Sequence, residues 1–112
     1  MLTANEYQMK ALRTANRKLN DKELLLDGLM GLNGEAGEAI DLLKKHLFQG
    51  HPLDEEHLAK ELGDVAWYLA ETSYALGYSL ETIFRMNLLK LAERYPEGFS
   101  SDRSLDRKEG DI

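Results

Sequence analysis

Two short acidic segments of the chain have the residue types and the spacing of a metal site. Residues 34–39 read GEAGEA and residues 60–65 read KELGDV. Each segment places two acids three positions apart, which on a helix brings their side chains onto one face. Carboxylates without a histidine or a thiolate beside them are the ligands that Mg²⁺ and Mn²⁺ prefer. The predicted metal ligands are Glu35, Glu38, Glu61 and Asp64.

The charges of this cluster indicate why a cation is needed. Side chains three apart on a helix have β-carbons about 5 to 6 Å apart, and two like charges at that distance repel by about 2 to 3 kcal/mol at an effective dielectric near 20. Only Asp64 has a lysine, Lys60, three or four positions away. A single Glu-x-x-Glu pair is usually a solvated helix face. The repetition of the pair in the same setting favours a metal site.

Helical phase relates each acidic pair to apolar residues on its own segment. If a helical wheel is drawn for each segment with its first glutamate, Glu35 or Glu61, at zero degrees, the apolar residues form a stripe on the same side of both wheels. The stripes consist of Leu32, Ala36, Ala39, Ile40 and Leu43, and of Leu58, Leu62, Val65, Ala66 and Leu69. We expect the two helices to pack antiparallel through these stripes, with the four carboxylates along one side of the seam.

Helix signals along the chain predict four helices and a tail. The expected helices cover about 3–19, about 22–48, 54–76 and 79–95, because caps and breakers stand at Asn20, Gly50, Asp54, Gly77 and Pro96. The fold class is therefore all-α, a four-helix bundle. We predict a helical domain over 1–95 and a polar tail over 96–112, in which only Phe99, Leu105 and Ile112 are apolar anchors.

Composition limits the class of protein. The chain has 112 residues, 43% of them hydrophobic and 30% charged, which is typical of a single globular domain. A net charge of −6 disfavours a nucleic-acid partner. No apolar run is long enough to span a membrane, and the start lacks the order of a signal peptide. The lack of cysteine favours a cytoplasmic protein.

The acidic spacing resembles that of a known family. Glu35-x-x-Glu38, followed after 22 residues by Glu61-x-x-Asp64, is similar to the signature of the MazG-like all-α nucleoside triphosphate pyrophosphohydrolases. The segment 87–99, NLLKLAERYPEGF, also resembles the stretch that follows the second acidic pair in small members. The likeness runs from Tyr7 to Phe99, and none of the four acids departs from the pattern.

The resemblance implies a reaction and a set of roles. Members convert a nucleoside triphosphate to the monophosphate and pyrophosphate with Mg²⁺, and Mn²⁺ is the alternative ion. It assigns the four acids as metal ligands, with Glu38 favoured as the acceptor of a proton from the attacking water. Asn87, Lys90 and Arg94 share one face of the fourth helix and are expected to bind phosphate oxygens.

Several other residues admit two interpretations. Tyr7, Gln8 and Thr14 resemble a first-helix pattern that approaches the nucleobase, although core packing or capping explains them nearly as well. The three histidines, His46, His51 and His57, form no histidine metal motif. Arg103 and Arg107 are more typical of a solvated tail than of a phosphate site.

Apolar residues on a second face of the third helix predict a partner. Gly63, Trp67, Ala70 and Tyr74 recur at helical spacing away from the first stripe, and the second helix has Gly34 and Gly37 on its corresponding side. We expect a homodimer or a dimer of dimers. The alternative is that Trp67 closes the core of its own chain beneath the first helix.

Two rival functions remain. A di-iron carboxylate bundle needs two Glu-x-x-His units, and the sequence has none. A non-catalytic helical interaction protein of the same fold would lack metal-dependent hydrolysis, and the four intact acids argue against it. The base and the sugar of the substrate stay open.

Overall fold

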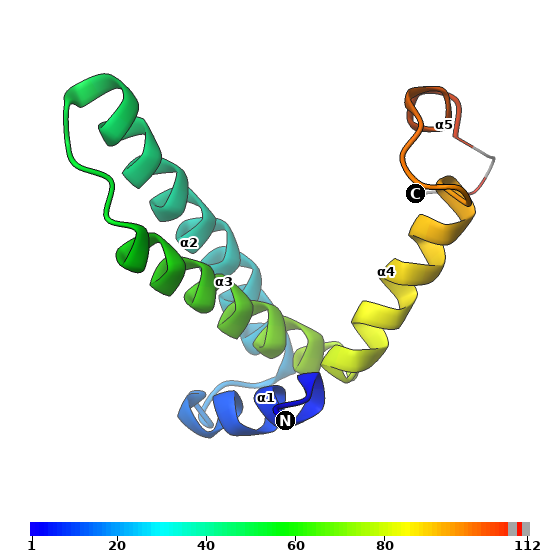
Figure 1. The fold of residues 1–112 in the computed structure, drawn as a ribbon. Helices are drawn as coiled ribbons and strands as arrows, with labels where there is room; N and C mark the ends of the chain where they lie inside the picture. The colour runs from blue at the N-terminus through cyan, green and yellow to red at the C-terminus, as the bar shows by residue number, and fades with distance from the viewer. Residues whose placement is uncertain (108–109, 111–112) are drawn as a thin grey trace. The chain divides into compact units, whose positions relative to one another are not determined.

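The computed structural model describes residues 1–107 and 110, and the described secondary structure is helical (Figure 1). The all-α prediction is therefore confirmed. Residues 108, 109, 111 and 112, which include the predicted tail anchor Ile112, lie outside the described residues. The helices are α1 (Ala4–Ala11), the 3₁₀ turn η1 (Leu12–Thr14), α2 (Asp21–Gln49), α3 (Glu55–Ala75), α4 (Leu80–Arg94) and α5 (Ser101–Leu105).

The boundaries of α2 and α3 follow the signals in the sequence. Asn20 forms a capping box, because its side chain accepts from Glu23 N at 2.9 Å while the Glu23 carboxylate accepts from Asn20 N at 3.0 Å. Gly50 ends α2 with φ of 74°, a left-handed conformation that glycine adopts without strain. Asp54 caps α3 by accepting from His57 N at 3.0 Å. Both helices end within one residue of the prediction.

The first helix is shorter than predicted. It ends at Ala11, and after η1 the backbone at Ala15 is extended, with ψ of 151°. The Ala11 carbonyl accepts from the Thr14 hydroxyl at 2.8 Å and from the Trp67 indole at 3.0 Å. Asn16 then accepts from Lys18 N at 3.1 Å. These side-chain bonds to the backbone compete with a continued helix, so the expectation of a helix to Leu19 was wrong.

Helices α2 and α3 form an antiparallel hairpin whose seam is closest at two glycines (Figure 1). A β-carbon at Gly28 would meet the Thr72 side chain and lie 3.2 Å from the Thr72 Cα, and one at Gly31 would meet the Tyr68 ring. The antiparallel packing was predicted, but the packed face was not. Ile40 and Leu62, from the predicted core stripes, are 63% and 58% exposed. The seam is instead rotated toward Glu35 and Glu61, since small residues at Gly28 and Gly31 permit close approach there.

Gln8 joins α1 to the end of α3. Its amide nitrogen donates to Ala70 O at 3.1 Å and to Tyr78 O at 3.3 Å, and its oxygen accepts from Leu80 N at 2.9 Å. Both ends of this buried amide are thereby satisfied. Of the two sequence interpretations of Gln8, packing within the core is the one that the structure supports.

Trp67 also lies against the first segment of its own chain. Its indole nitrogen donates to Ala11 O and to Thr14 Oγ1, each at 3.0 Å, and its ring meets Tyr68 edge to face at 5.1 Å. Ala70, on the same stripe, is fully buried. Trp67 and Ala70 are thus covered by their own chain, as the alternative expected, whereas Gly63 and Tyr74 on the same stripe are exposed. The expectation that the stripe faces a partner stays a prediction.

The chain divides into two compact units, Met1–Leu80 and Glu81–Ile112. The second unit holds the remainder of α4 and the short helix α5, which Ser100 caps. Tyr95 and Phe99 contact each other there, with ring centroids 5.4 Å apart. The predicted boundary at residue 96 stays a prediction. Within the described residues, no helix is both long and apolar enough to cross a membrane.

Candidate metal centre

Three of the four predicted ligands converge on the α2–α3 seam. Glu35 and Glu38 on α2 and Glu61 on α3 each offer a carboxylate oxygen, and these oxygens lie within 4.8 Å of one another. Glu61 is 8% exposed, whereas Glu38 is exposed. Within the described part of the chain, none of the three pairs with a lysine or an arginine. The cluster is thus a partly buried concentration of negative charge.

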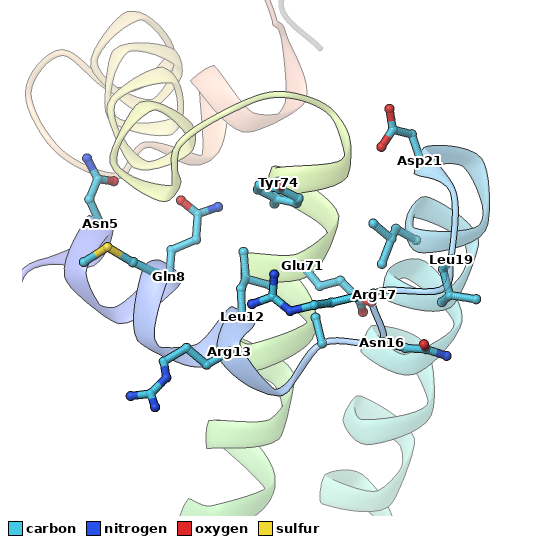
Figure 2. Close-up of a pocket in the computed structure, with 13 residues that line it drawn as sticks. Asn5, Gln8, Leu12, Arg13, Asn16, Arg17, Leu19, Asp21, Glu71 and Tyr74 are labelled. Carbon is cyan, nitrogen blue, oxygen red and sulfur yellow. The ribbon is translucent and has the colours of Figure 1, made fainter.

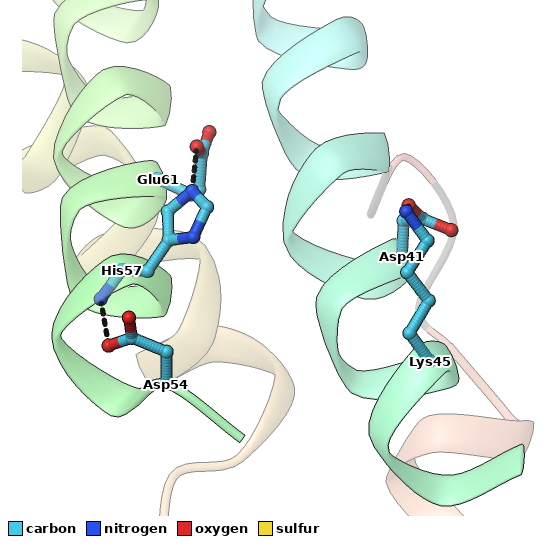
Figure 3. A network of polar contacts seen from close by, with 5 residues as sticks. All are labelled: Asp41, Lys45, Asp54, His57 and Glu61. Carbon is cyan, nitrogen blue, oxygen red and sulfur yellow. Dashed lines mark hydrogen bonds and ion pairs between the residues drawn. The ribbon is translucent and has the colours of Figure 1, made fainter. Parts of the chain in front are cut away.

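His57 is a neighbour of this cluster that the sequence interpretation set aside. Its Nε2 lies 3.1 Å from Glu61 Oε1, one helical turn before it on α3 (Figure 3). A histidine that bonds to a ligand from behind orients that ligand and tunes its basicity. The i, i+4 spacing of His57 and Glu61 was the signal for this contact. The Asp41–Lys45 pair on α2, 2.9 Å apart, is also drawn in Figure 3.

The proximity of the acids changes the proton affinity of Glu35. A hydrogen bond to Glu61, followed by burial and by the charges of Glu61, Asp64 and Glu38, raises the pKa of Glu35 to about 7. The direction follows from the geometry, because two adjacent carboxylates are more stable with one proton between them. A cation bound between these carboxylates would also remove their repulsion, and no proton would then be needed.

Asp64 does not belong to the three acids whose oxygens lie within 4.8 Å of one another. It lines a small pocket with Glu35, Trp67 and Tyr68, and its charge contributes to the raised pKa of Glu35. Burial, and then the charge of Asp64, also raise the pKa of Tyr7 on α1. Asp64 therefore adds negative charge beside Glu35.

The residues present fit a hard divalent cation. When Glu35 is ionised, Glu61 Oε2 is buried without a hydrogen-bond donor, which is costly unless a proton on Glu35 or a cation binds it. The donor atoms are carboxylate oxygens from two helices, the set that Mg²⁺ and Mn²⁺ select. The second oxygen, Oε1, is occupied by His57. Glu61 is thus held in place with one oxygen left for an ion.

The predicted phosphate ligands lie on α4, which belongs to the second unit. Asn87 and Lys90 are exposed and Arg94 is half-buried. The helix runs unbroken from Leu80 to Arg94, so their spacing does place them on one face. Their contact with a phosphate stays a prediction.

Comparison with known proteins identifies the family. A model of the MazG nucleotide pyrophosphohydrolase domain matches residues 25–99, which include all four acids. The chain belongs to this family. The MazG domain here is also similar to the Gene 37 protein of Mycobacterium phage L5, with 40% identity over 73 residues. That match covers 62% of this chain and 64% of the phage protein, so less than two thirds of the relative's length is spanned. No solved structure matches the MazG domain significantly.

Proposed function

We propose that this MazG domain is a divalent-metal-dependent nucleoside triphosphate pyrophosphohydrolase, which releases a nucleoside monophosphate and pyrophosphate. The observation that carries the proposal is the convergence of Glu35, Glu38 and Glu61 without a lysine or arginine partner in the described part of the chain, together with the buried Glu61 oxygen that lacks a donor when Glu35 is ionised. Family membership supplies the reaction class.

The acids would hold Mg²⁺ between α2 and α3, with Asp64 completing the set. When bound, the ion supplies charge neutralisation for the triphosphate and a lowered pKa for an attacking water. The water oxygen forms a bond to the α-phosphorus, and the bond from that phosphorus to the bridging oxygen breaks, so that pyrophosphate leaves. Glu38 is the favoured acceptor of the water proton, because it is the exposed member of the group.

Asn87, Lys90 and Arg94 are proposed to bind the phosphate oxygens from one face of α4. Lysine and arginine bind phosphates through charge-assisted hydrogen bonds, and an asparagine amide donates a further one. Exposure of Asn87 and Lys90 on an intact helix supports the proposal.

We also propose that the chain works as a homodimer or a dimer of dimers. Only Leu24, Ala70 and Leu80 are buried hydrophobic residues in the described part of the chain. Ile40 and Leu62 are exposed on the hairpin, and Gly34 and Gly37 have nothing within 4 Å where a β-carbon would stand. Association would bury this surface. Sedimentation velocity should therefore show a dimer or tetramer, and a monomer at micromolar concentration would contradict it.

The test of the reaction is product identification. Ribo- and deoxyribonucleoside triphosphates are incubated with the protein and Mg²⁺, with Mn²⁺, and with a chelator, and the products are separated by anion exchange. We expect monophosphate and pyrophosphate in equal amounts, and no product in chelator. Release of diphosphate with orthophosphate, or turnover that survives chelation, would reject the proposal.

A further inference from the structure

A cavity of about 400 Å³ opens between α2 and α3 beside the metal centre. Glu38 on α2 and Glu61 on α3 line it, and both belong to the group of converging acids. Asp41 and Lys45 line it farther along α2, and His57 lines it from α3 (Figure 3). A ligand in this cavity would therefore lie directly against two of the predicted metal ligands.

Lys45 brings a positive charge close to these acids. Its ammonium nitrogen lies 2.9 Å from Asp41 Oδ2. Side chains on a helix lean toward its N-terminus, so the ammonium group lies near the level of Asp41 and not at that of its own backbone. Asp41 follows Glu38 by three positions, a rise of about 4.5 Å along the helix. The charge of Lys45 is thus about one helical turn from a predicted metal ligand.

The ion pair with Asp41 leaves Lys45 able to bind a further group. An ammonium group has three donors, and Asp41 engages it through one oxygen. Both side chains are 45% exposed, and pairs of this kind contribute little to stability. The pair is nevertheless shorter and less exposed than the Glu56–Lys60 pair of α3, which spans 3.5 Å with side chains 81% and 74% exposed. Asp41 therefore keeps the ammonium group beside the cavity while donors remain for a ligand.

The charges of the cavity favour an anion only when a cation is also present. Glu38, Glu61 and Asp41 place three carboxylates against the one ammonium group of Lys45. The remaining basic side chain, His57, has its Nε2 engaged by Glu61 at 3.1 Å. This excess of negative charge would repel a free phosphate. With a divalent cation held by the acids, an anion in contact with both the cation and Lys45 would be stabilised instead.

The other pocket beside the acids has no such cation. It is lined by Glu35, Asp64, Trp67 and Tyr68, and none of these side chains carries a positive charge. Of the two pockets that border the metal centre, the one with Lys45 is therefore the better place for phosphate groups.

The larger cavity beside α1 has positive charge but does not reach the metal centre. It measures about 640 Å³, and its lining includes Glu71 from α3 together with Arg13 and Arg17 (Figure 2). None of its lining residues belongs to the group of converging acids. An anion bound there would not contact a metal ion on Glu61.

We propose that Lys45 binds the β- and γ-phosphate oxygens of the nucleotide, in the cavity between α2 and α3. This inference rests on the proposed function, and it adds a lysine of α2 to the phosphate ligands proposed on α4. The ammonium group donates charge-assisted hydrogen bonds to these oxygens. It also stabilises the negative charge that the pyrophosphate gains when its bond to the α-phosphorus breaks.

The test measures the binding of inorganic pyrophosphate, which does not depend on the base of the substrate. Calorimetry with Mg²⁺ and with chelator compares wild type with Lys45→Met and Lys44→Met. Lys44 is the matched control, because it is the exposed neighbour and does not line the cavity. Methionine and lysine have similar helix propensities, so both variants should fold. In Mg²⁺ we expect binding to weaken by about 10- to 100-fold in Lys45→Met and to stay at the wild-type level in Lys44→Met.

Asp41→Asn separates phosphate binding from the ion pair. This variant removes the charge of Asp41 but keeps the ammonium group of Lys45, to which the new amide oxygen can still bond. Pyrophosphate should therefore bind as tightly as to wild type, or more tightly, because one negative charge has left the cavity. A purely structural pair predicts equal losses in Asp41→Asn and Lys45→Met, and that result would overturn the inference.

Acetylation of the wild-type protein gives a measurement without any substitution. Mg²⁺ together with pyrophosphate should protect Lys45 from acetylation, as followed by mass spectrometry, and leave Lys44 as reactive as before. Equal reactivity of Lys45 with and without bound pyrophosphate would contradict the contact.

The outcomes separate this inference from the reaction itself. If triphosphates are hydrolysed but Lys45→Met and Lys44→Met bind pyrophosphate alike, the inference is overturned and the hydrolase stands. Wild-type binding that is absent at millimolar pyrophosphate, or equal in Mg²⁺ and in chelator, would also overturn it. In the second case the anion would lie away from the metal centre, as beside Arg13 and Arg17. If no triphosphate is hydrolysed while Lys45→Met alone loses Mg²⁺-dependent binding, the proposed reaction fails and the phosphate site at Lys45 stands.

Discussion

Glu35, Glu38 and Glu61 meet at a level of the α2–α3 seam that is partly open to solvent, whereas Glu71 is buried farther along α3, at a covered level beside α1 and η1. At the open level, within the described residues, none of the three carboxylates pairs with a lysine or an arginine, and Glu61 Oε2 is buried without a donor when Glu35 is ionised. At the covered level, burial and the charge of Asp27 raise the pKa of Glu71 to about 7. The comparison teaches that one seam can keep negative charge for a cation at one place and favour the uncharged form of a carboxyl group at another.

The largest effect should come from removing a carboxylate from the open level of the seam, where Glu35, Glu38 and Glu61 converge. We expect Glu61→Gln to lower Mg²⁺-dependent turnover at least about 100-fold, because even an outer partner of a metal ligand is worth 10- to 100-fold. Glu56→Gln is the matched control, since Glu56 is on the same helix, is exposed, and pairs with Lys60 at 3.5 Å. Initial rates of pyrophosphate release measure both. Equal losses in the two variants would mean that the position of the acid does not matter.

The buried carboxyl group of Glu71 should make the free energy of unfolding depend on pH. The raised pKa of Glu71 means that the native state holds this proton to about pH 7, while the unfolded chain releases it near the ordinary value of 4.5. The native state therefore binds more protons between these values, and the free energy of unfolding falls as pH rises through this window. The loss should be about 3 kcal/mol, since each unit of pKa difference is worth about 1.4 kcal/mol.

Glu71→Gln should remove that part of the pH dependence. Urea unfolding in chelator at pH 4.5 and pH 8 gives the difference for each protein, and Glu35 contributes to both alike. A variant with the same slope as wild type would show that Glu71 is not protonated in the native state.

The third prediction concerns the support of Glu61. His57→Ala should weaken Mg²⁺ affinity by about 10-fold, because Glu61 loses the partner that orients its Oε1. His51→Ala is the control, since that histidine is exposed and contacts neighbouring residues through its backbone carbonyl. Calorimetric titration with Mg²⁺ compares them. If both variants bind the ion as wild type does, His57 has no role at the site.

The smallest effect is expected from a substitution at Gly28, where α2 and α3 approach each other closely. Gly28→Ala should destabilise the hairpin by about 1 to 3 kcal/mol, because the new β-carbon meets Thr72 and part of that contact is backbone. Asn33→Ala adds the same residue to an exposed position of α2 and should be neutral or slightly stabilising. Thermal melts measure the two. A Gly28→Ala protein as stable as wild type would show that close approach at Gly28 is not required.

Much of this architecture was predictable because its signals are local. Asn20, Gly50 and Asp54 set helix ends through their own side chains or backbone, and the repeated acidic pairs predicted that carboxylates from α2 and α3 converge. The end of α1 was not predictable, since it depends on Trp67, which is distant in sequence. The rotation of the seam depends on the close contact between Gly28 and Thr72. A helical wheel of one segment contains no information on such contacts between helices.

Glu71 was missed for a different reason. It falls two turns after Asp64, so continuing the phase of the acidic pairs would have found it. Its burial could not be read in this way, because α1 and η1 cover it and the sequence favoured a longer, regular first helix.

The central claim is that Glu35, Glu38, Glu61 and Asp64 form a metal site and not a structural acidic face. The most direct test is the thermal melting of wild type and Glu38→Gln, each with Mg²⁺ and with chelator. In chelator the variant should be as stable as wild type or more stable, because one charge has left a repulsive cluster. Mg²⁺ should raise the Tm of wild type, since it binds only the native state, and raise that of the variant much less. A variant that melts well below wild type in chelator, with an equal response to Mg²⁺, would contradict the metal site.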